Sequence, residues 1–162
     1  MASSIAAAVA DRLAMADPGN AGRYHANAAR AARSLEALDA ELARRLAPVT
    51  GRPFLVFHDA YQYLERRYGL NAVGAIAVSP ERKPGARRIQ ALRRRVAESG
   101  AACVFREPQF DPGLVATVTE GTRARTATLD PLGAGIADGP GLYPALMREM
   151  AGALADCLTP AG

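Results

Sequence analysis

Three predicted strands of this sequence end at polar side chains that can bind a metal ion: His58 and Asp59, Glu107 after Arg106, and Asp130. In an open parallel sheet, ligands bind outside the carboxyl ends of the strands. If the three strands are parallel, one imidazole and several carboxylates converge on the same edge. These are the donors that zinc and other divalent first-row ions use in proteins. The pattern therefore indicates a candidate metal site.

The same side chains have a simpler structural interpretation, which the spacing leaves open. A histidine or an aspartate at a strand end often caps a helix or forms hydrogen bonds within a loop. His25, the second of the two histidines, lies on the polar side of a helical segment. We expect its side chain to be a solvated surface group.

The sequence lacks the motifs of several enzyme classes. It has no Gly-x-Ser-x-Gly elbow, no Walker loop and no Gly-x-Gly-x-x-Gly after a predicted strand. A glycine-rich stretch at 132–136 follows an apolar run, but no helix starts close to it. We interpret that stretch as a connector, so binding is favoured over catalysis.

Cys103 and Cys157 are the two cysteines, and no Cys-x-x-Cys motif is present. Cys103 begins a predicted strand, at the amino-end edge of the sheet. The last predicted helix runs back from the opposite edge and brings Cys157 to the same side. The pair is either a disulfide, which requires an oxidising compartment, or two buried thiols.

The predicted elements alternate in a regular order. Helices are predicted at 5–13 and 21–46, followed by strands at 54–57, 72–78, 103–105 and 125–129 and by helices at 60–68, 85–99, 112–121 and 143–158. This order predicts an α/β fold, with a long N-terminal backbone helix before a four-stranded, mainly parallel sheet flanked by helices. The expected strand order is 2-1-3-4. We divide the chain into N-terminal helices at 1–50 and a carboxy-terminal α/β lobe at 51–162.

The composition argues against several kinds of partner. With 49% hydrophobic and 22% charged residues, the chain is an ordinary globular one, and its apolar runs end long before the roughly 20 residues of a membrane span. The net charge of +4, the absence of tryptophan and only 6% aromatic residues argue against nucleic acid. Five arginines crowd the predicted helix at 85–99, opposite its apolar face: Arg87, Arg88, Arg93, Arg94 and Arg95. This is typical of a surface helix, and binding to nucleic acid or acidic lipid is the alternative.

Several segments, taken together, resemble the periplasmic zinc-binding subunit of bacterial ABC-type zinc importers (ZnuA type). In chain order they are Phe54-Leu55-Val56-Phe57-His58-Asp59-Ala60-Tyr61, Tyr68-Gly69-Leu70, Pro84-Gly85, Glu107-Pro108-Gln109-Phe110 and Thr128-Leu129-Asp130-Pro131-Leu132-Gly133. The run 24–39 is similar to the long backbone helix of that family. The resemblance extends over nearly the whole chain and keeps the order of the family.

The resemblance implies two α/β lobes joined by a long helix, with the metal between them. Only the backbone helix and the carboxy-terminal lobe have counterparts here, so the amino-terminal lobe and its histidines are expected to be missing. We expect the carboxy-terminal half of a periplasmic zinc-capture protein that hands zinc to a membrane permease and is not an enzyme. The sequence from Met1 to Ala10 does not resemble an export signal.

The resemblance also assigns roles to single residues. His58 matches the zinc-binding histidine of the carboxy-terminal lobe, and this histidine favours zinc, because manganese-type members place a carboxylate there. Asp130 matches a carboxylate that is a ligand in manganese-type members and is nearer to water-linked in zinc-type ones, and Glu107 is a supporting residue. The cysteine pair, Cys103 and Cys157, matches a disulfide of some zinc-type members.

Two further expectations follow, and other functions stay open. His58 and Asp130 offer two ligands where zinc takes about four, so the chain alone is expected to bind zinc weakly. The apolar faces of the helices at 5–13 and 21–46 predict a homodimer, unless the first helix covers the exposed surface within a monomer. The alternatives are a manganese-type metal-binding lobe, a self-association module and a flavodoxin-like domain without a transport role.

Overall fold

The computed structural model describes residues 2–77 and 85–160 and separates the chain into two units, Met1–Ala43 and Arg44–Gly162. The long helix α2 (Ala21–Leu46) has the bounds that its apolar stripe predicts, and it is followed by the 3-10 turn η2 (Ala47–Val49). Pro48 in that turn has no N–H for a helical hydrogen bond. None of the described helices is both long and apolar enough to cross a lipid bilayer.

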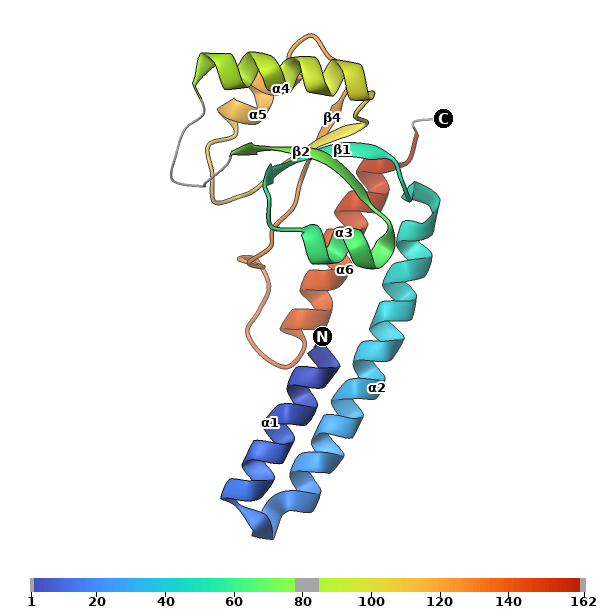
Figure 1. The fold of residues 1–162 in the computed structure, drawn as a ribbon, viewed down its shortest axis with the longest axis vertical. Coiled ribbons are helices and arrows are strands. Elements are labelled where there is room, and N and C mark those ends of the chain that lie inside the picture. Colours follow the sequence, from blue (N-terminus) through green and yellow to red (C-terminus); the bar gives the residue numbers. More distant parts are fainter. Residues whose placement is uncertain (1, 78–84, 161–162) are drawn as a thin grey trace. The chain divides into compact units, whose positions relative to one another are not determined.

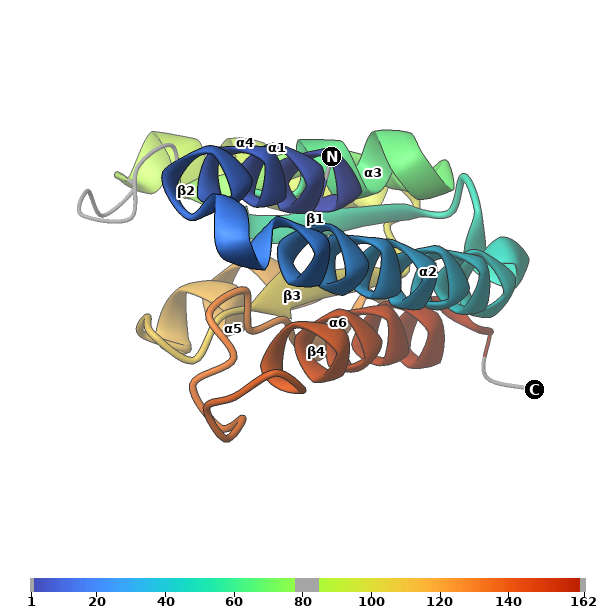
Figure 2. The same ribbon diagram turned by 90° about the horizontal axis from the view of Figure 1, so that it is seen from below.

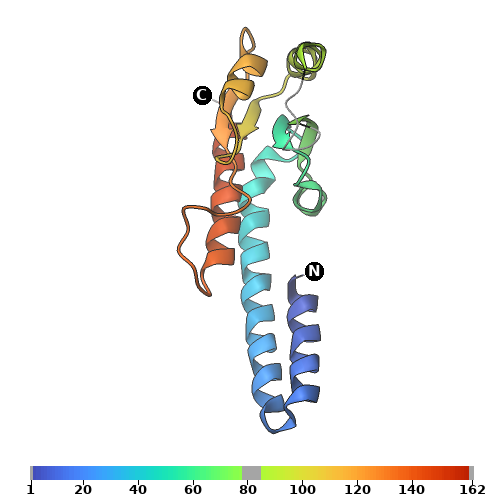
Figure 3. The ribbon, with the colours of Figure 1, turned by 90° about the vertical axis from the view of Figure 1, so that its left-hand side faces the viewer.

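The first unit is a helix pair. Helix α1 (Ala2–Ala16) and the 3-10 turn η1 (Pro18–Asn20) lead into α2, which runs back alongside α1 (Figures 1 and 3). The carboxylate of Asp17 accepts hydrogen bonds from Asn20 Nδ2 (2.7 Å) and the hydroxyl of Tyr24 (2.8 Å). These bonds, Asn20 first, hold the pKa of Asp17 below its usual value. An ionised aspartate therefore fixes the turn.

The second unit is built on a parallel sheet of four strands. They are β1 (Pro53–His58), β2 (Asn71–Ala77), β3 (Cys103–Arg106) and β4 (Arg125–Thr128). Their order is β2-β1-β3-β4, and all neighbours are parallel, which confirms the predicted order and fold class. In Figure 2 the strands follow one another in this order from top to bottom. The predicted end of the second strand at Val78 lies outside the described residues, as do the loop Ser79-Pro80-Glu81 and Pro84.

Four helices cover the two faces of this sheet. Helices α4 (Ala86–Ser99) and α5 (Gly113–Thr119) lie on one face, and α3 (Gln62–Tyr68) and α6 (Leu142–Leu158) lie on the other (Figures 1 and 3). The core under α4 and α5 contains Leu55, Phe57, Ile76, Leu92, Val96, Val104, Val115 and Val118. On the opposite face the rings of Phe54 and Phe105 pack edge to face, with their centroids 5.6 Å apart. The apolar run of β1 is thus buried on both sides, as predicted.

Helix α4 also covers the exposed edge of the sheet. Arg88 and Arg95 donate hydrogen bonds to the carbonyls of Ala75 (2.8 Å) and Val73 (2.9 Å) on the edge strand β2. Gly74 leaves room for this contact, because an added Cβ would lie only 3.1 Å from Nη1 of Arg95. Two of the arginines that the sequence assigns to the surface thus block an edge that could otherwise pair with another strand.

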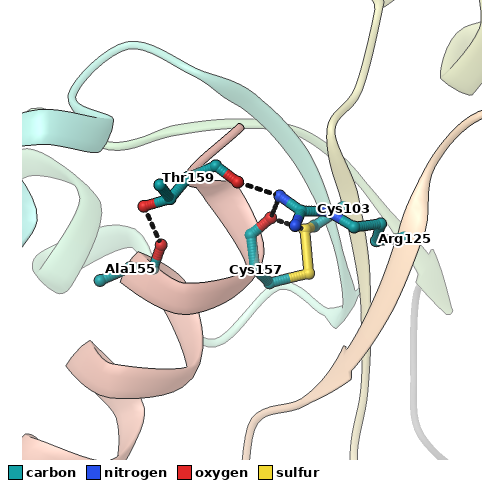
Figure 4. The surroundings of a disulfide bond; sticks show 5 residues. All are labelled: Cys103, Arg125, Ala155, Cys157 and Thr159. Atoms are coloured by element: carbon teal, nitrogen blue, oxygen red, sulfur yellow. Dashed lines mark hydrogen bonds between the residues drawn. A yellow bond between two sulfur atoms is a disulfide. The ribbon is translucent and has the colours of Figure 1, made fainter. Parts of the chain in front are cut away.

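A disulfide joins the sheet to the last helix. Cys103 at the start of β3 is bonded to Cys157 in the last turn of α6, with the Cα atoms 6.1 Å apart (Figure 4). The guanidinium of Arg125 donates hydrogen bonds to the carbonyls of Cys157 and Thr159 beside this bond (Figure 4). The end of α6 is therefore held at the amino-end edge of the sheet, where the predicted topology brings the two cysteines together.

Candidate metal centre

The carboxyl ends of β1 and β3 bring two of the predicted site residues into contact. His58 is the last residue of β1, and Glu107 follows the last residue of β3. Since the two strands are parallel neighbours, they end at the same edge of the sheet. His58 Nδ1 and Glu107 Oε1 are 2.7 Å apart, within hydrogen-bond distance.

Glu107 is held in a position that is unusual for a carboxylate. It is 2% exposed and is the one charged side chain that is buried among the described residues. Its Oε1 also accepts a hydrogen bond from the hydroxyl of Tyr61, at 3.0 Å. Burial and the nearby carboxylate raise the pKa of Tyr61, so the hydroxyl keeps its proton and donates. These contacts offset the desolvation of Glu107.

The imidazole of His58 forms a hydrogen bond with the described residues through Nδ1. Its side chain is 24% exposed, and Nε2 makes no hydrogen bond with the described residues. The ring of Phe110 lies edge-on to the imidazole, with the ring centroids 6.3 Å apart, and stacks on Phe57, with the centroids 4.6 Å apart. A histidine that contacts a buried carboxylate through one ring nitrogen, and is partly exposed, has the surroundings of many metal-binding histidines.

Asp130 lies two residues after β4 and is anchored by several donors. Its Oδ1 accepts hydrogen bonds from Gln109 Nε2 (2.8 Å) and the backbone N–H of Leu132 (3.1 Å), and its Oδ2 accepts one from the N–H of Ala134 (2.7 Å). Burial alone would raise the pKa of Asp130, but these hydrogen bonds outweigh it and hold the pKa below its usual value. Asp130 is therefore a carboxylate, and it fixes the start of the loop after β4.

The described residues do not assemble a complete set of metal ligands. Within the ranges 2–77 and 85–160, no three His, Cys, Asp or Glu side chains come together as a metal-binding group. The two cysteines are joined in the disulfide, and His25 is 55% exposed, with Nδ1 3.8 Å from a carboxylate oxygen of Asp11. The chemistry of His58 and Asp130 fits zinc, but the number of donors is below the four that zinc takes.

Sequence reasoning missed two residues that hold the carboxylates of the candidate site. Tyr61 contacts the supporting residue Glu107, and Gln109 contacts Asp130. Both belong to segments that carry the resemblance to zinc-binding subunits, shortly after His58 and Glu107. Their roles depend on which side chains meet across neighbouring strands, which a linear motif does not specify.

Comparison with known proteins identifies the family. The family model described as "Zinc-uptake complex component A periplasmic" matches residues 1–157. The chain belongs to this family. The resemblance inferred from the motifs is confirmed, and with it the α/β fold of a zinc-uptake solute-binding protein.

Members of the zinc-uptake family match this chain over part of their length. The high-affinity zinc uptake system protein ZnuA of Brucella suis is 53% identical over 155 residues, which are 96% of this chain and 46% of that protein. ZnuA of Paracoccus denitrificans is 48% identical over 153 residues, 94% of this chain and 47% of that protein. A crystal structure of ZnuA is similar with a TM-score of 0.79 and 30% identity, covering 93% of this chain and 54% of that one. The chain spans about half the length of these curated relatives.

Proposed function

We propose that this chain forms the carboxy-terminal half of a periplasmic protein that captures zinc and delivers it to an ABC-type membrane permease. The observation that carries the proposal is the contact of His58 with the buried carboxylate of Glu107 through Nδ1, which leaves Nε2 without a hydrogen bond to the described residues. Membership in a zinc-uptake family supports the choice of cargo. Zinc is bound and released without a bond being made or broken, so the proposed role is not enzymatic.

In this proposal, His58 binds zinc through Nε2 and Asp130 contributes one carboxylate oxygen. Glu107 supports the site from beneath, because it contacts His58 rather than the ion. The remaining ligands are proposed to come from an amino-terminal half, since the chain spans about half the length of its relatives. A site shared between two halves would close on the ion and open to release it.

Zinc is favoured over manganese by the donor type. Imidazole nitrogen suits zinc, whereas manganese prefers an oxygen environment. A manganese-type metal-binding lobe is the alternative proposal. It predicts that manganese competes effectively with zinc for His58.

The two histidines of the chain allow a direct test. Zinc is titrated into the ¹⁵N-labelled 162-residue chain while the imidazole resonances of His58 and His25 are followed by NMR. We expect the Nε2 resonance of His58 to shift progressively, without tight stoichiometric binding, because only two of about four ligands are present. A tenfold excess of manganese over zinc should leave this shift in place.

The variants His58→Ala and His25→Ala complete this experiment. The first should abolish the zinc-dependent changes and the second should preserve them. A response of His25 with none at His58 would contradict the proposed site. Tight uptake of one zinc per chain would contradict the proposal that the site is partial.

We also propose that the isolated chain forms a homodimer through its N-terminal helices. Three apolar side chains lie four residues apart on α1 and are largely exposed: Ile5 (59%), Val9 (51%) and Leu13 (42%). Such a continuous apolar stripe is typical of a surface that packs against another chain or domain. A second copy is the proposed occupant for the chain on its own.

A further inference from the structure

We propose that one turn, Glu107–Phe110, positions both candidate zinc ligands, and that Glu107 keeps the proton of His58 on Nδ1 so that Nε2 is available to the metal. The identity of the ion rests on the function proposed above. The positioning itself is a property of the metal-free chain and can be tested without zinc.

The place of this turn in the sheet explains how it reaches two ligands. It follows β3, which lies between β1 and β4 in the strand order. His58 ends the neighbour on one side, and Asp130 follows the neighbour on the other. Only the segment after β3 therefore adjoins both ligand-bearing strand ends.

Glu107 determines which nitrogen of His58 carries the proton. Oε1 of Glu107 already accepts a hydrogen bond from Tyr61, and we infer that it also accepts the one from Nδ1 at 2.7 Å, which places the imidazole proton on Nδ1. Tyr61 donates to the same oxygen and holds Glu107 from a second direction. In a neutral imidazole the other nitrogen then has a free lone pair, which is what a metal ion needs.

Gln109 acts on the second ligand in a similar way. Its amide and the N–H of Leu132 donate to Oδ1 of Asp130, and the N–H of Ala134 donates to Oδ2. These donors fix the direction in which the carboxylate faces.

The turn is anchored in the core, so its side chains are fixed relative to the strands. The N–H of Phe110 donates to the carbonyl of Glu107 at 3.2 Å and closes the turn. The ring of Phe110 is parallel to that of Phe57, with an angle of 5° between the planes. Half of a metal site is thus formed before the ion arrives, which reduces the ordering that binding requires.

The tautomer of His58 is the decisive measurement. Long-range ¹H–¹⁵N NMR spectra of the metal-free, ¹⁵N-labelled chain are recorded at alkaline pH, where imidazoles are neutral. We expect His58 to show a protonated Nδ1 and an unprotonated Nε2, and His25 to show the mixture of an exposed histidine. A predominantly Nε2-protonated His58 in the unmodified chain would overturn the proposal, whatever the variants do.

Two substitutions at position 107 separate positioning from packing. Glu107→Gln keeps an acceptor oxygen and should retain the Nδ1–H form, whereas Glu107→Leu has no acceptor and should lose it. His25 is the internal control, since its resonances should be the same in all three proteins. Loss of the Nδ1–H form in folded Glu107→Gln, or its persistence in folded Glu107→Leu, would also refute the proposed role.

The role of Gln109 is tested by Gln109→Met, with Gln90→Met on the exposed face of α4 as the matched control. Gln109→Met should increase amide exchange several-fold at Leu132 and Ala134 and weaken the zinc response of His58 by about 10–100-fold. The control should change neither, and an unchanged Gln109→Met protein would overturn this part.

The outcomes distinguish the two proposals. An Nδ1-protonated His58 that does not respond to zinc would leave the positioning intact and refute the proposed function. If His58 responds to zinc but has no fixed tautomer, the proposed function is supported and the proposed positioning by Glu107 is refuted.

Discussion

The two histidines show how strongly local surroundings decide what one residue type can do. His25 lies on a helix with its side chain 55% exposed, whereas His58 is 24% exposed and contacts a buried carboxylate. The two side chains are chemically identical. In the sequence, only the position of His58 after the apolar run 54–57 distinguishes it from His25. That position was sufficient to predict a candidate ligand, because parallel strands end at one edge.

The contacts around His58 were beyond sequence reasoning, for a physical reason. Whether Tyr61 reaches Glu107, or Gln109 reaches Asp130, depends on strand register and on side-chain rotamers. Residues 46 and 21 positions apart meet only because β1, β3 and β4 are neighbours. A motif gives residue types in order, but it does not give these distances.

At this scale we predict that Tyr61→Phe destabilises the chain. The change removes a hydrogen bond to a buried carboxylate without altering the packed ring, and such bonds contribute about 1.5–3 kcal/mol. Urea unfolding followed by circular dichroism measures the loss. Tyr63→Phe is the control, because Tyr63 is 72% exposed and its change should have almost no effect. Equal stabilities of the two variants would contradict a stabilising role for the Tyr61–Glu107 bond.

Among the elements, the long apolar and alternating runs were the most predictable. The bounds of α2 agree with those predicted. The strand order follows from right-handed crossovers and from one reversal in the direction in which successive parallel strands are added to the sheet. Short elements differ by one to three residues at their ends. For example, the helix predicted at 60–68 begins at Gln62, because the backbone of Tyr61 is outside helical geometry (φ −107°, ψ 7°).

The arginines of α4 give a prediction for the exposed edge of β2. The double variant Arg88→Ala/Arg95→Ala removes two hydrogen bonds to edge carbonyls and should lower the free energy of unfolding by about 1–2 kcal/mol. The matched control Arg87→Ala/Arg94→Ala makes the same change in charge and should stay within about 0.5 kcal/mol of the original. Chemical denaturation of both proteins decides whether contacts or charge matter on this helix.

The disulfide is the second element-scale test. Cys103 and Cys157 are separated by 54 positions, and closing a loop of that size stabilises a chain by about 4 kcal/mol in the chain-entropy model. Cys103→Ala/Cys157→Ala should lose this amount under oxidising conditions. Addition of a reductant should then destabilise the original chain but not the variant. Two free thiols in oxidised material would show that the bond does not form.

On the scale of the whole molecule, the chain spans about half the length of its curated relatives. The two units, Met1–Ala43 and Arg44–Gly162, are separately compact, and the candidate ligands His58 and Asp130 belong to the second. The division of ligands between this chain and another half was inferred from the resemblance, not from composition. The residues of this chain alone do not indicate metal ligands that another part of a longer protein would supply.

The exposed stripe on α1 predicts concentration-dependent association. Light scattering at micromolar and tenfold higher concentration should give a mass approaching twice that of the monomer, because each chain gains by removing apolar surface from water. Val9→Glu places a charge in the stripe and should restore the monomer, whereas Ser4→Glu adds the same charge at an exposed position on another side of the helix and should not. A monomeric mass at both concentrations would contradict the proposed dimer.

Strand β3 has one further consequence, which concerns insertions and deletions. Every second residue from the start of β3 has a partner that fixes the direction of its side chain. Cys103 is bonded to Cys157, Phe105 contacts Phe54, and Glu107 contacts Tyr61. Because side chains in a strand alternate between the two faces, adding or removing one residue between Cys103 and Glu107 would turn the carboxylate away from His58 while the disulfide kept its place. The number of positions that separate Cys103 from Glu107 should therefore stay even. We expect natural variants in which this number is odd to lack Glu107 as well.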